Sequence, residues 1–477
     1  MSPRLWGRYP AAMLTRLLTL RMRVSILDPM LTDDQYSSVL RGLSAPLKLL
    51  ARDDVRSFLE ALDSPGQKAG RYRTWREGRF HEPKPEGLSL EQLQALWRYD
   101  REQRSISIGL LAFEEQPMRV NLSRPTLRAI QEVALFEALG ADHQVTQPSL
   151  DESDQYRYYS LIEEAFASSL IEGAMTSRRV AKDLARSKRA PKNASEHMIL
   201  NNWRALNRIP EWQEQPLSSA LLCEIQALIT ENTDLGKEDV GSLRTEDDIV
   251  VFDRRSNEVI HQPPPASELP ERMLRLSRFA AEDQGLAPLL RAILVHHQIA
   301  FDHPFRDGNG RTARVAFLLE ATRDSKLNWL QLVPFSRAIA KDKAAYYQSF
   351  VDTASEGWDT THFVRSQLRY LAIECERLAN FLTDEVRQRA KYSSKLHLES
   401  KLNARQMTLI RSALRSSHAF FTQVEHAQYH QVTTMTAQRD LTQLVKWRLL
   451  LKRKDPKDGR RYLYWATKRL GDLAEEG

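Results

Sequence analysis

Residues 303–314, HPFRDGNGRTAR, concentrate reactive side chains in a chain whose remainder is mostly ordinary helical sequence. The imidazole of His303 has an ordinary pKa of about 6.5, so it can take a proton from a hydroxyl near neutral pH. Arg311 and Arg314 lie one helical turn apart, which places both guanidinium groups on the same side of a helix. A base beside two forked cations predicts proton transfer next to a bound phosphate.

The DGNG sequence between the base and the arginines is turn chemistry. Gly308 and Gly310, on either side of Asn309, allow positive φ and carry no Cβ, so backbone N–H groups can converge on an anion. A helix expected to open at Arg311 adds the positive end of its dipole. Asp307 is a lone carboxylate at the mouth of this cradle, the arrangement that usually holds Mg²⁺ beside phosphates. The stretch therefore predicts a polyphosphate cradle with one metal ligand.

These twelve residues match the signature of Fic-domain proteins, HxFx(D/E)GNGRxxR, at every specified position. The resemblance extends over roughly residues 150–380, and RTWREGRFHEPKPEGL at 73–88 looks like the N-terminal part of one bacterial Fic subgroup. The resemblance implies a mostly helical Fic fold that transfers AMP from ATP to a Ser, Thr or Tyr hydroxyl of a protein.

The resemblance also implies a role for each residue of the signature. His303 would be the general base, and Asp307 would hold Mg²⁺, with ATP as the substrate. Asn309 and Arg311 would bind oxygens of the α- and β-phosphates, and Arg314 would bind the γ-phosphate.

Two short β-branched runs, Ile249–Phe252 and Val259–Ile260, are separated by polar residues and closed by Pro263–Pro265. This pattern predicts a β-hairpin, and in a helical domain at least one edge of such a hairpin is expected to be open. The resemblance makes it the flap of the family, which aligns the main chain of the target by strand addition. The predicted docking residues are Ile249, Val250, Val251 and Phe252.

An amphipathic helix is predicted for residues 160–175, and SSLIEG at 168–173 lies on it. This segment resembles the Fic inhibitory motif, (S/T)xxxE(G/N), through Ser168, Glu172 and Gly173. The resemblance pairs Glu172 with Arg314, where the carboxylate imitates the γ-phosphate and holds ATP in an unproductive pose. Some relatives with this motif also remove AMP, so transfer and removal both stay open.

The composition is that of a soluble, globular protein with several domains: 477 residues, 42% hydrophobic and 27% charged. The net charge of +7 fits a nucleotide or nucleic-acid ligand without selecting either. Cys223 and Cys375 make no disulfide framework, so the reducing cytoplasm is the expected compartment. No apolar run approaches the length of a membrane span.

Four parts are expected along the chain. Residues 1–70 are predicted to be a partly disordered N-terminal extension, residues 71–150 an N-terminal helical region, and residues 151–397 the Fic domain. Three short helical patterns and a basic hairpin at 404–470 predict a winged helix-turn-helix. The fold class is therefore mainly α.

In the C-terminal module Thr434 is predicted to cap the third helix, whose Leu441, Leu444 and Val445 face the core. The outward set consists of Thr436, Gln438, Arg439 and the basic wing, Lys452, Arg453, Lys454, Lys457, Arg460 and Arg461. One interpretation places this helix in a DNA major groove with the wing on phosphates. The alternative is protein contact or dimerisation, because winged-helix folds serve in DNA binding and in protein contact alike.

Two hypotheses of different class follow. The first is a self-inhibited protein adenylyltransferase that modifies another protein or itself. The second is a DNA-binding regulator whose Fic domain senses nucleotide. A homodimer is compatible with either. His296 and His297, on the helix before the signature, are expected to be packing or surface residues and not metal ligands.

Overall fold

The computed structural model divides the chain into two compact units. Unit 1 consists of residues up to 108 with 116–127 and 350–362, and unit 2 of residues 109–115, 128–349 and 363–477. No described helix is both long and apolar enough to cross a membrane. The residues that the structure describes are 33–43, 46–63, 72–113, 116–136, 150–187, 189–252, 259–282, 285–393, 402–415, 420–430, 432–455, 459, 461–468 and 470.

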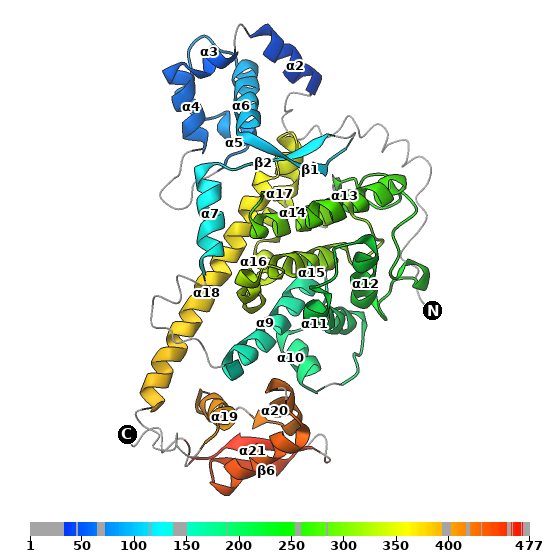
Figure 1. Cartoon of the computed structure of the whole chain (residues 1–477), viewed down its shortest axis with the longest axis vertical. Coiled ribbons are helices and arrows are strands. Elements are labelled where there is room, and N and C mark those ends of the chain that lie inside the picture. Colours follow the sequence, from blue (N-terminus) through cyan, green and yellow to red (C-terminus); the bar gives the residue numbers. More distant parts are fainter. Residues whose placement is uncertain are drawn as a thin grey trace. The chain divides into compact units, whose positions relative to one another are not determined.

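Unit 1 begins with short helices, drawn in blue in Figure 1. They are α2 (Asp33–Gly42), α3 (Pro46–Leu50), α4 (Asp53–Asp63), α5 (Trp75–Gly78) and α6 (Leu90–Arg104). Helix α6 starts directly after Ser89, because Ser89 and Gln92 form a reciprocal capping box. Its buried Leu93, Leu96 and Trp97 pack against Val55 and other apolar side chains of α4.

The 71–150 region is not purely helical, which corrects the expectation. It contains a two-stranded sheet of β1 (Ser105–Leu111) and β2 (Pro117–Asn121), followed by α7 (Arg124–Ala134). The β1 sequence SISIGLL alternates polar or small residues with apolar ones, and Ile108 and Leu110 are buried. This period of two was a usable signal for a strand. The predicted disorder near the N-terminus falls on residues 1–32, outside the described residues.

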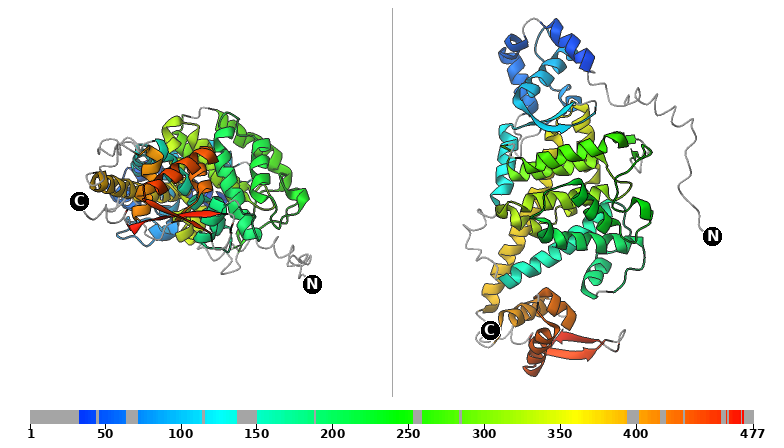
Figure 2. Two further views of the ribbon diagram at one scale, coloured as in Figure 1. Left: turned by 90° about the horizontal axis from the view of Figure 1, so that it is seen from below. Right: turned by 45° about the vertical axis from the view of Figure 1, so that its right-hand side comes forward.

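Unit 2 is built around two adjacent antiparallel helices, α14 (Pro288–Asp302) and α15 (Asn309–Thr322), shown in green in Figure 1. Both are buried on nearly every side, as central helices are. The surrounding helices, seen from two more directions in Figure 2, are α9 (Leu150–Ile171), α10 (Arg178–Ser187), α11 (Ala194–Trp212), α12 (Ser219–Thr230), α13 (Leu269–Ala281), α16 (Ser336–Lys341), α17 (Lys343–Ser355) and α18 (Thr361–Ser393), with 3-10 turns η1 (Lys237–Asp239), η2 (Ala266–Glu268) and η3 (Ser325–Leu332).

The predicted hairpin is present as β3 (Val251–Phe252) and β4 (Val259–His261), paired antiparallel. Among the described residues this sheet has only these two strands, so its outer edges are unpaired there. Strand β3 is shorter than the predicted run, because Ile249 and Val250 precede it and pair with nothing in the sheet, whereas β4 extends one residue beyond Ile260. Residues 253–258, the predicted turn, lie outside the described residues.

The C-terminal elements follow the predicted order of three helices and a hairpin: α19 (Ala404–Arg415), α20 (Gln423–Tyr429), α21 (Thr434–Lys446), β6 (Leu450–Lys454) and β7 (Tyr462–Ala466). A further short strand, β5 (Phe420–Phe421), extends the sheet to the order β5-β7-β6. Thr433 and not Thr434 caps α21, because the Thr433 hydroxyl accepts from the backbone N–H of Thr436 at 3.2 Å.

Candidate active site

The loop between α14 and α15 holds the predicted signature. His303 terminates α14 in the left-handed region, with φ 47° and ψ 56°, which is uncommon for a residue other than glycine. Gly308 takes φ 86° and precedes the first residue of α15. The helix therefore opens at Asn309, two residues earlier than expected, and the backbone N–H groups of Asn309 and Gly310 lie in its first turn.

Asn309 braces the loop that it belongs to. Its side-chain oxygen accepts from the Phe305 backbone N–H at 2.8 Å, and its amide nitrogen donates to the Phe305 carbonyl at 2.6 Å. Both Phe305 and Asn309 are buried. The Asn309 side chain, which is also a predicted phosphate contact, therefore stabilises the conformation of the loop through these two hydrogen bonds.

His303 has the geometry of a neutral base. Its Nδ1 lies 3.3 Å from the carbonyl oxygen of Ala300. A carbonyl can only accept, so Nδ1 carries the hydrogen in this contact and Nε2 keeps its lone pair. Burial lowers the pKa of His303 below its ordinary value, which favours the uncharged ring at neutral pH.

Arg311 is fully buried and reaches back over the loop. Its Nη2 lies 3.1 Å from Asp307 Oδ2, and its Nη1 donates to the Ile229 carbonyl at 3.3 Å. Its Nε is buried without a hydrogen-bond acceptor among the described residues. Asp307 is the solvent-facing member of the pair, with 53% of its side chain exposed. A buried donor in need of an acceptor and an accessible carboxylate fit an anion and a hydrated cation, respectively.

The predicted inhibitory residues converge on Arg314. Its Nε donates to Ser168 Oγ at 2.8 Å and its Nη2 to the Ser168 carbonyl at 3.0 Å. The same Nη2 lies 2.7 Å from Glu172 Oε1. Gly173 takes φ 94° just after α9 ends at Ile171, so the glycine stops the helix as predicted.

Gly310 leaves space for the Glu172 carboxylate. A Cβ at position 310 would overlap Glu172 Oε1 and approach Arg314 Nη1 to 3.2 Å. The carboxylate therefore lies against the first turn of α15, where the helix dipole also favours a negative charge. Any side chain at this position would disturb that contact.

The charge of Glu172 is stabilised despite its surroundings. Burial alone would raise the pKa of its carboxyl, but the charges of Arg314 and then Arg311 outweigh that effect and hold the pKa below its ordinary value. Glu172 keeps 27% of its side chain exposed, while Arg314 is almost completely buried. The pair is thus ionised at neutral pH and reachable from one side.

Two polar residues of α9 were missed from the sequence. Ser160 and Glu164 lie four and eight residues before Ser168, so the three share one side of the helix, and Glu172 follows at the same spacing just after its end. Ser160 Oγ donates to the Leu332 carbonyl at 3.0 Å, and a Glu164 oxygen accepts from the Ser336 backbone N–H at 2.9 Å. The spacing of four was the signal that could have found them, and their contacts fix the register of α9.

Arg306, an unspecified position of the signature, was also missed. It forms ion pairs of 2.7 to 3.1 Å with Asp239, Glu246 and Asp248, in the segment that leads into the hairpin. The loop with the predicted base is therefore tied to the root of the hairpin by charge.

The predicted docking residues lie at the surface of unit 2. Phe252 is exposed, and Ile249, Val250 and Val251 are half-buried. Two histidines of α14 behave as expected: His296 and His297 are buried among aromatic rings, and His296 Nε2 lies 3.0 Å from the Tyr346 hydroxyl. No cluster of three potential metal-ligating His, Cys, Asp or Glu side chains occurs in the described part of the chain.

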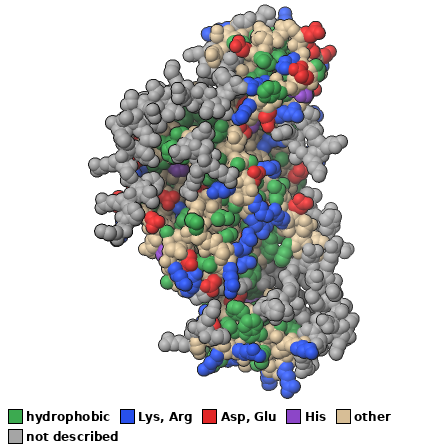
Figure 3. Space-filling view, turned by 180° about the vertical axis from the view of Figure 1, so that it is seen from behind, with side chains coloured by type: hydrophobic (Ala, Val, Ile, Leu, Met, Phe, Trp, Pro, Cys, Tyr) green, Lys and Arg blue, Asp and Glu red, His purple; other side chains and the backbone are tan. Residues whose placement is uncertain are grey.

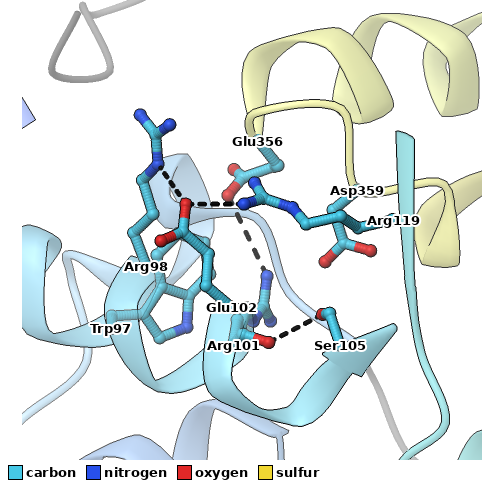
Figure 4. Close-up of a pocket in the computed structure, with 8 residues that line it drawn as sticks. All are labelled: Trp97, Arg98, Arg101, Glu102, Ser105, Arg119, Glu356 and Asp359. Atoms are coloured by element: carbon cyan, nitrogen blue, oxygen red, sulfur yellow. Dashed lines mark hydrogen bonds and ion pairs between the residues drawn. The ribbon is translucent and has the colours of Figure 1, made fainter. Parts of the chain in front are cut away.

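Unit 1 has a polar cluster of its own, drawn in Figure 4. The Arg101 guanidinium lies 3.8 Å from the ring centre of Tyr72 and 3.9 Å from that of Trp97. Its Nη1 is 3.9 Å from Glu356 Oε2, and Glu356 also accepts from the Trp75 backbone N–H at 2.8 Å. The residues that line this pocket are Trp97, Arg98, Arg101, Glu102, Ser105, Arg119, Glu356 and Asp359.

Residues 216–321 match the family model described as the Fic/DOC family. The protein adenylyltransferase Fic of Drosophila grimshawi is 34% identical over 107 residues, which are 22% of this chain and 20% of that protein. The protein of the same name from Drosophila melanogaster is 30% identical over 154 residues, or 31% of this chain and 29% of that protein. The chain thus matches less than a third of the length of these relatives.

Two solved structures align with part of the chain. A Fic family protein from Desulfovibrio desulfuricans G20 is 18% identical, with a TM-score of 0.48 over 73% of this chain and 97% of that one. Fic-1 from C. elegans is 17% identical, with a TM-score of 0.45 over 78% of this chain and 93% of that one. The family model thus covers the signature loop and both of its arginines, and the curated relatives that match this part of the chain are protein adenylyltransferases.

Proposed function

We propose that this protein transfers AMP from ATP to a Ser, Thr or Tyr hydroxyl of a protein target, and that Glu172 inhibits the transfer from within the chain. The observation that carries the proposal is the convergence of a neutral histidine, a glycine loop and two buried arginines at the first turn of α15. Each of these groups has a distinct task in phosphoryl chemistry.

The phosphates of ATP would lie against the loop. Backbone N–H groups of Gly308, Asn309 and Gly310 and the guanidinium of Arg311 would contact the α- and β-phosphates. Arg314 would bind the γ-phosphate. Asp307 would hold Mg²⁺, which when bound neutralises charge on the phosphate oxygens. The exposure of the Asp307 carboxylate beside the cradle supports this assignment.

His303 would act as the general base. The target hydroxyl oxygen attacks the α-phosphorus and forms a new O–P bond, while the bond from the α-phosphorus to the bridging oxygen breaks and pyrophosphate leaves. Nε2 of His303 accepts the hydroxyl proton as the nucleophile attacks. The exposed edge of the β3–β4 hairpin would hold the target main chain by strand addition, so that the hydroxyl is presented to this nitrogen.

Glu172 would compete with the γ-phosphate for Arg314. A charge-assisted hydrogen bond of about 1.5–3 kcal/mol is enough to change binding roughly 10- to 100-fold. Since Glu172 is reachable from solvent on one side, the pair can be opened without unfolding α9. The ion pair between Arg314 and Glu172 supports this proposed inhibition.

The test uses purified protein, Mg²⁺ and ATP labelled at the α-phosphate, with cell lysate as a source of targets. Covalent label should rise in Glu172→Gly and vanish when His303→Ala is added to that variant. No label on any variant would reject the proposal. In that case the same protein, given a pre-labelled target, would show whether it removes AMP, with Glu172 activating water.

A second proposal concerns residues 404–470, whose element order supports a winged helix-turn-helix. This module holds 14 Lys and Arg against four Asp and Glu, a formal charge of +10 that exceeds the +7 of the whole chain. Gln438, Arg439, Lys452, Arg453 and Lys454 are exposed on α21 and β6. Figure 3 shows Lys and Arg side chains, in blue, at the lower end of the molecule, where this module lies.

We infer that this module contacts the phosphates of duplex DNA. Asp440 supports this orientation, because it turns inward to pair with Arg405 at 2.7 Å and leaves Arg439 on the surface. A gel shift with duplex DNA should weaken steeply with salt, and exchange of Lys452, Arg453 and Lys454 for Gln should flatten that dependence. Binding that is absent at low salt would leave protein contact as the function of this module.

A further inference from the structure

The last carbonyl groups of α14 receive hydrogen bonds from residues of the hairpin and of the segment before it. A helix leaves its last carbonyl groups without partners inside the helix. The Phe301 carbonyl accepts from His261 Nε2 at 2.6 Å, on β4. The next carbonyls, those of Asp302, His303 and Pro304, all accept from Arg244, which lies before β3.

Arg244 is the central member of this arrangement. Its side chain is 1% exposed. Nε donates to the His303 carbonyl at 3.0 Å, Nη2 contacts the Asp302 carbonyl at 3.4 Å, and the backbone N–H donates to the Pro304 carbonyl at 2.9 Å. One residue therefore holds the backbone on both sides of the left-handed His303.

The same guanidinium also holds the two flanks of the hairpin together. Nη1 donates to the Glu246 carbonyl at 3.2 Å, just before β3, and Nη2 donates to the Pro264 carbonyl, just after β4. Nη1 also contacts Asp247 Oδ1 at 3.2 Å, and that oxygen accepts from the Ala266 backbone N–H at 2.6 Å. A planar group with five donors can satisfy this many acceptors at once, whereas an ammonium group cannot.

We propose that Arg244 is a positioning residue that fixes His303 and the hairpin relative to each other, so that the base and the target main chain are presented as one rigid unit. The catalytic half of this inference rests on the proposed AMP transfer. Arg244 touches neither reacting atom in the proposed mechanism. It acts through the backbone of His303 and through the roots of the strands that would bind the target.

This role separates transfer from nucleotide binding. Arg244 reaches the loop after His303 only through its backbone N–H, at Pro304. The proposed cradle for ATP is formed by residues 308–310 and by Arg311 and Arg314, none of which Arg244 contacts in the described hydrogen bonds. Loss of Arg244 should therefore reduce kcat and leave the affinity for ATP nearly unchanged. Displacement of a reacting group by about 1 Å can cost on the order of 100-fold in rate.

The experiment compares Arg244→Lys with its parent in the Glu172→Gly background. Arg208→Lys serves as the matched control, because Arg208 is an exposed arginine that pairs with Glu211. Three quantities are measured: hydrogen exchange of the backbone amides in residues 245–252, 259–266 and 299–306, the Kd for ATP, and kcat for transfer. Arg244→Lys should speed exchange in all three segments, lower kcat about 100-fold and change Kd less than threefold.

Exchange does not require any AMP transfer, so it tests the coupling even if the proposed activity fails. Exchange equal to that of the parent in either the hairpin flanks or residues 299–306 would overturn the inference. Equal losses in kcat and in ATP affinity would also overturn it, because they indicate collapse of the whole site. Asp247→Ala provides a milder second variant, since its side chain is 61% exposed, and it should speed exchange mainly in residues 259–266.

Discussion

The candidate site and the polar cluster of unit 1 each set a glutamate against a buried arginine, with different geometry. Glu172 lies 2.7 Å from Arg314 and keeps 27% of its side chain exposed. Glu356 lies 3.9 Å from Arg101 and is 3% exposed. The Arg101 guanidinium contacts two aromatic rings and donates to the Arg73 carbonyl at 2.7 Å. Figure 4 draws Arg101 together with Trp97 and Glu356.

The two carboxyl groups also shift in opposite directions. Burial raises the pKa of Glu356 to about 8, and the charge of Arg101 only partly offsets that effect. Arg314 instead holds the pKa of Glu172 below its ordinary value. Because Glu172 is partly exposed, another anion can replace its carboxylate on Arg314. Glu356 is enclosed, so no anion from solvent can take its place beside Arg101. The difference marks Glu172 as a removable contact and Glu356 as part of the fold.

The largest predicted effect is on stability, in Arg101→Met. This change removes the contacts of the guanidinium with both rings and its hydrogen bond to the Arg73 carbonyl, while Glu356, with its raised pKa, stays uncharged near neutral pH. The loss should therefore be about 3–5 kcal/mol. Arg314→Met should cost less, because Glu172 can turn toward water. Chemical denaturation of both variants, followed by tryptophan fluorescence, measures the two losses.

Equal losses in the two variants would contradict the comparison, because they would mean that both pairs are structural. Arg128→Met is a suitable control, since Arg128 and Glu132 form an exposed i,i+4 pair that should contribute less than about 1 kcal/mol.

The second prediction concerns Glu164, a buried carboxyl about two helical turns before Glu172, and the effect of its pKa on stability. Burial raises the pKa of Glu164 from 4.5 to about 7, despite its bonds from Ser336. The folded protein thus retains a proton that the unfolded chain loses, so this stabilisation is complete below pH 4.5 and lost as pH rises through 7. Glu164→Gln does not titrate and should gain relative to the wild type, by roughly 3 kcal/mol at most, between pH 5 and 8.

Unfolding curves of both proteins at pH 5, 6, 7 and 8 measure this difference. Parallel stability profiles would show that Glu164 stays ionised in the folded protein and would remove the contrast with Glu172.

The sequence predicted the parts of the site that are close along the chain. His303, the glycines and both arginines of the signature follow one another within twelve residues, so local rules for turns and helix ends place them. Glu172 is 142 residues from Arg314, and only the resemblance to Fic proteins suggested that pair. Arg244 was missed, because its acceptors are carbonyl groups from three separate segments, and backbone carbonyls leave no mark in a sequence.

The helical core was predictable for a similar reason. The helices from α11 to α15 carry amphipathic or apolar periodicity, which is the local signal for a helix. The β1–β2 sheet was missed because the short alternation in SISIGLL was overlooked beside a long helix. Its pairing partner, β2, shows weaker alternation, so the sheet depends on contacts that the sequence alone does not specify.

The third prediction concerns catalysis. Glu172→Gln retains an acceptor for Arg314 without the charge, so it should release transfer less than Glu172→Gly, with both falling in a range of about 10- to 100-fold above wild type. The pair needs ionised Glu172, which is present above the ordinary pKa and lost as pH falls through the lowered one.

The ratio of mutant to wild-type rates should therefore be constant between pH 6 and 9. A ratio that approaches one as the pH falls from 9 to 6 would show that another group with a pKa near neutrality controls the inhibition.

The smallest effect is expected for Ser168→Ala. Ser168 Oγ accepts from Arg314 Nε at 2.8 Å, while the Ser168 carbonyl still accepts from Nη2 at 3.0 Å, so Arg314 keeps most of its partners. The loss of about 1 kcal/mol, roughly fivefold, should weaken the hold of Arg314 on Glu172 and on a γ-phosphate alike. The weaker binding of Glu172 and the weaker binding of the γ-phosphate cancel in the wild type, where transfer should change less than twofold.

In the Glu172→Gly background no carboxylate competes with the γ-phosphate, so the Kd for ATP should rise about fivefold. Strong activation of the wild type by Ser168→Ala would instead mean that Ser168 positions α9 and not Arg314.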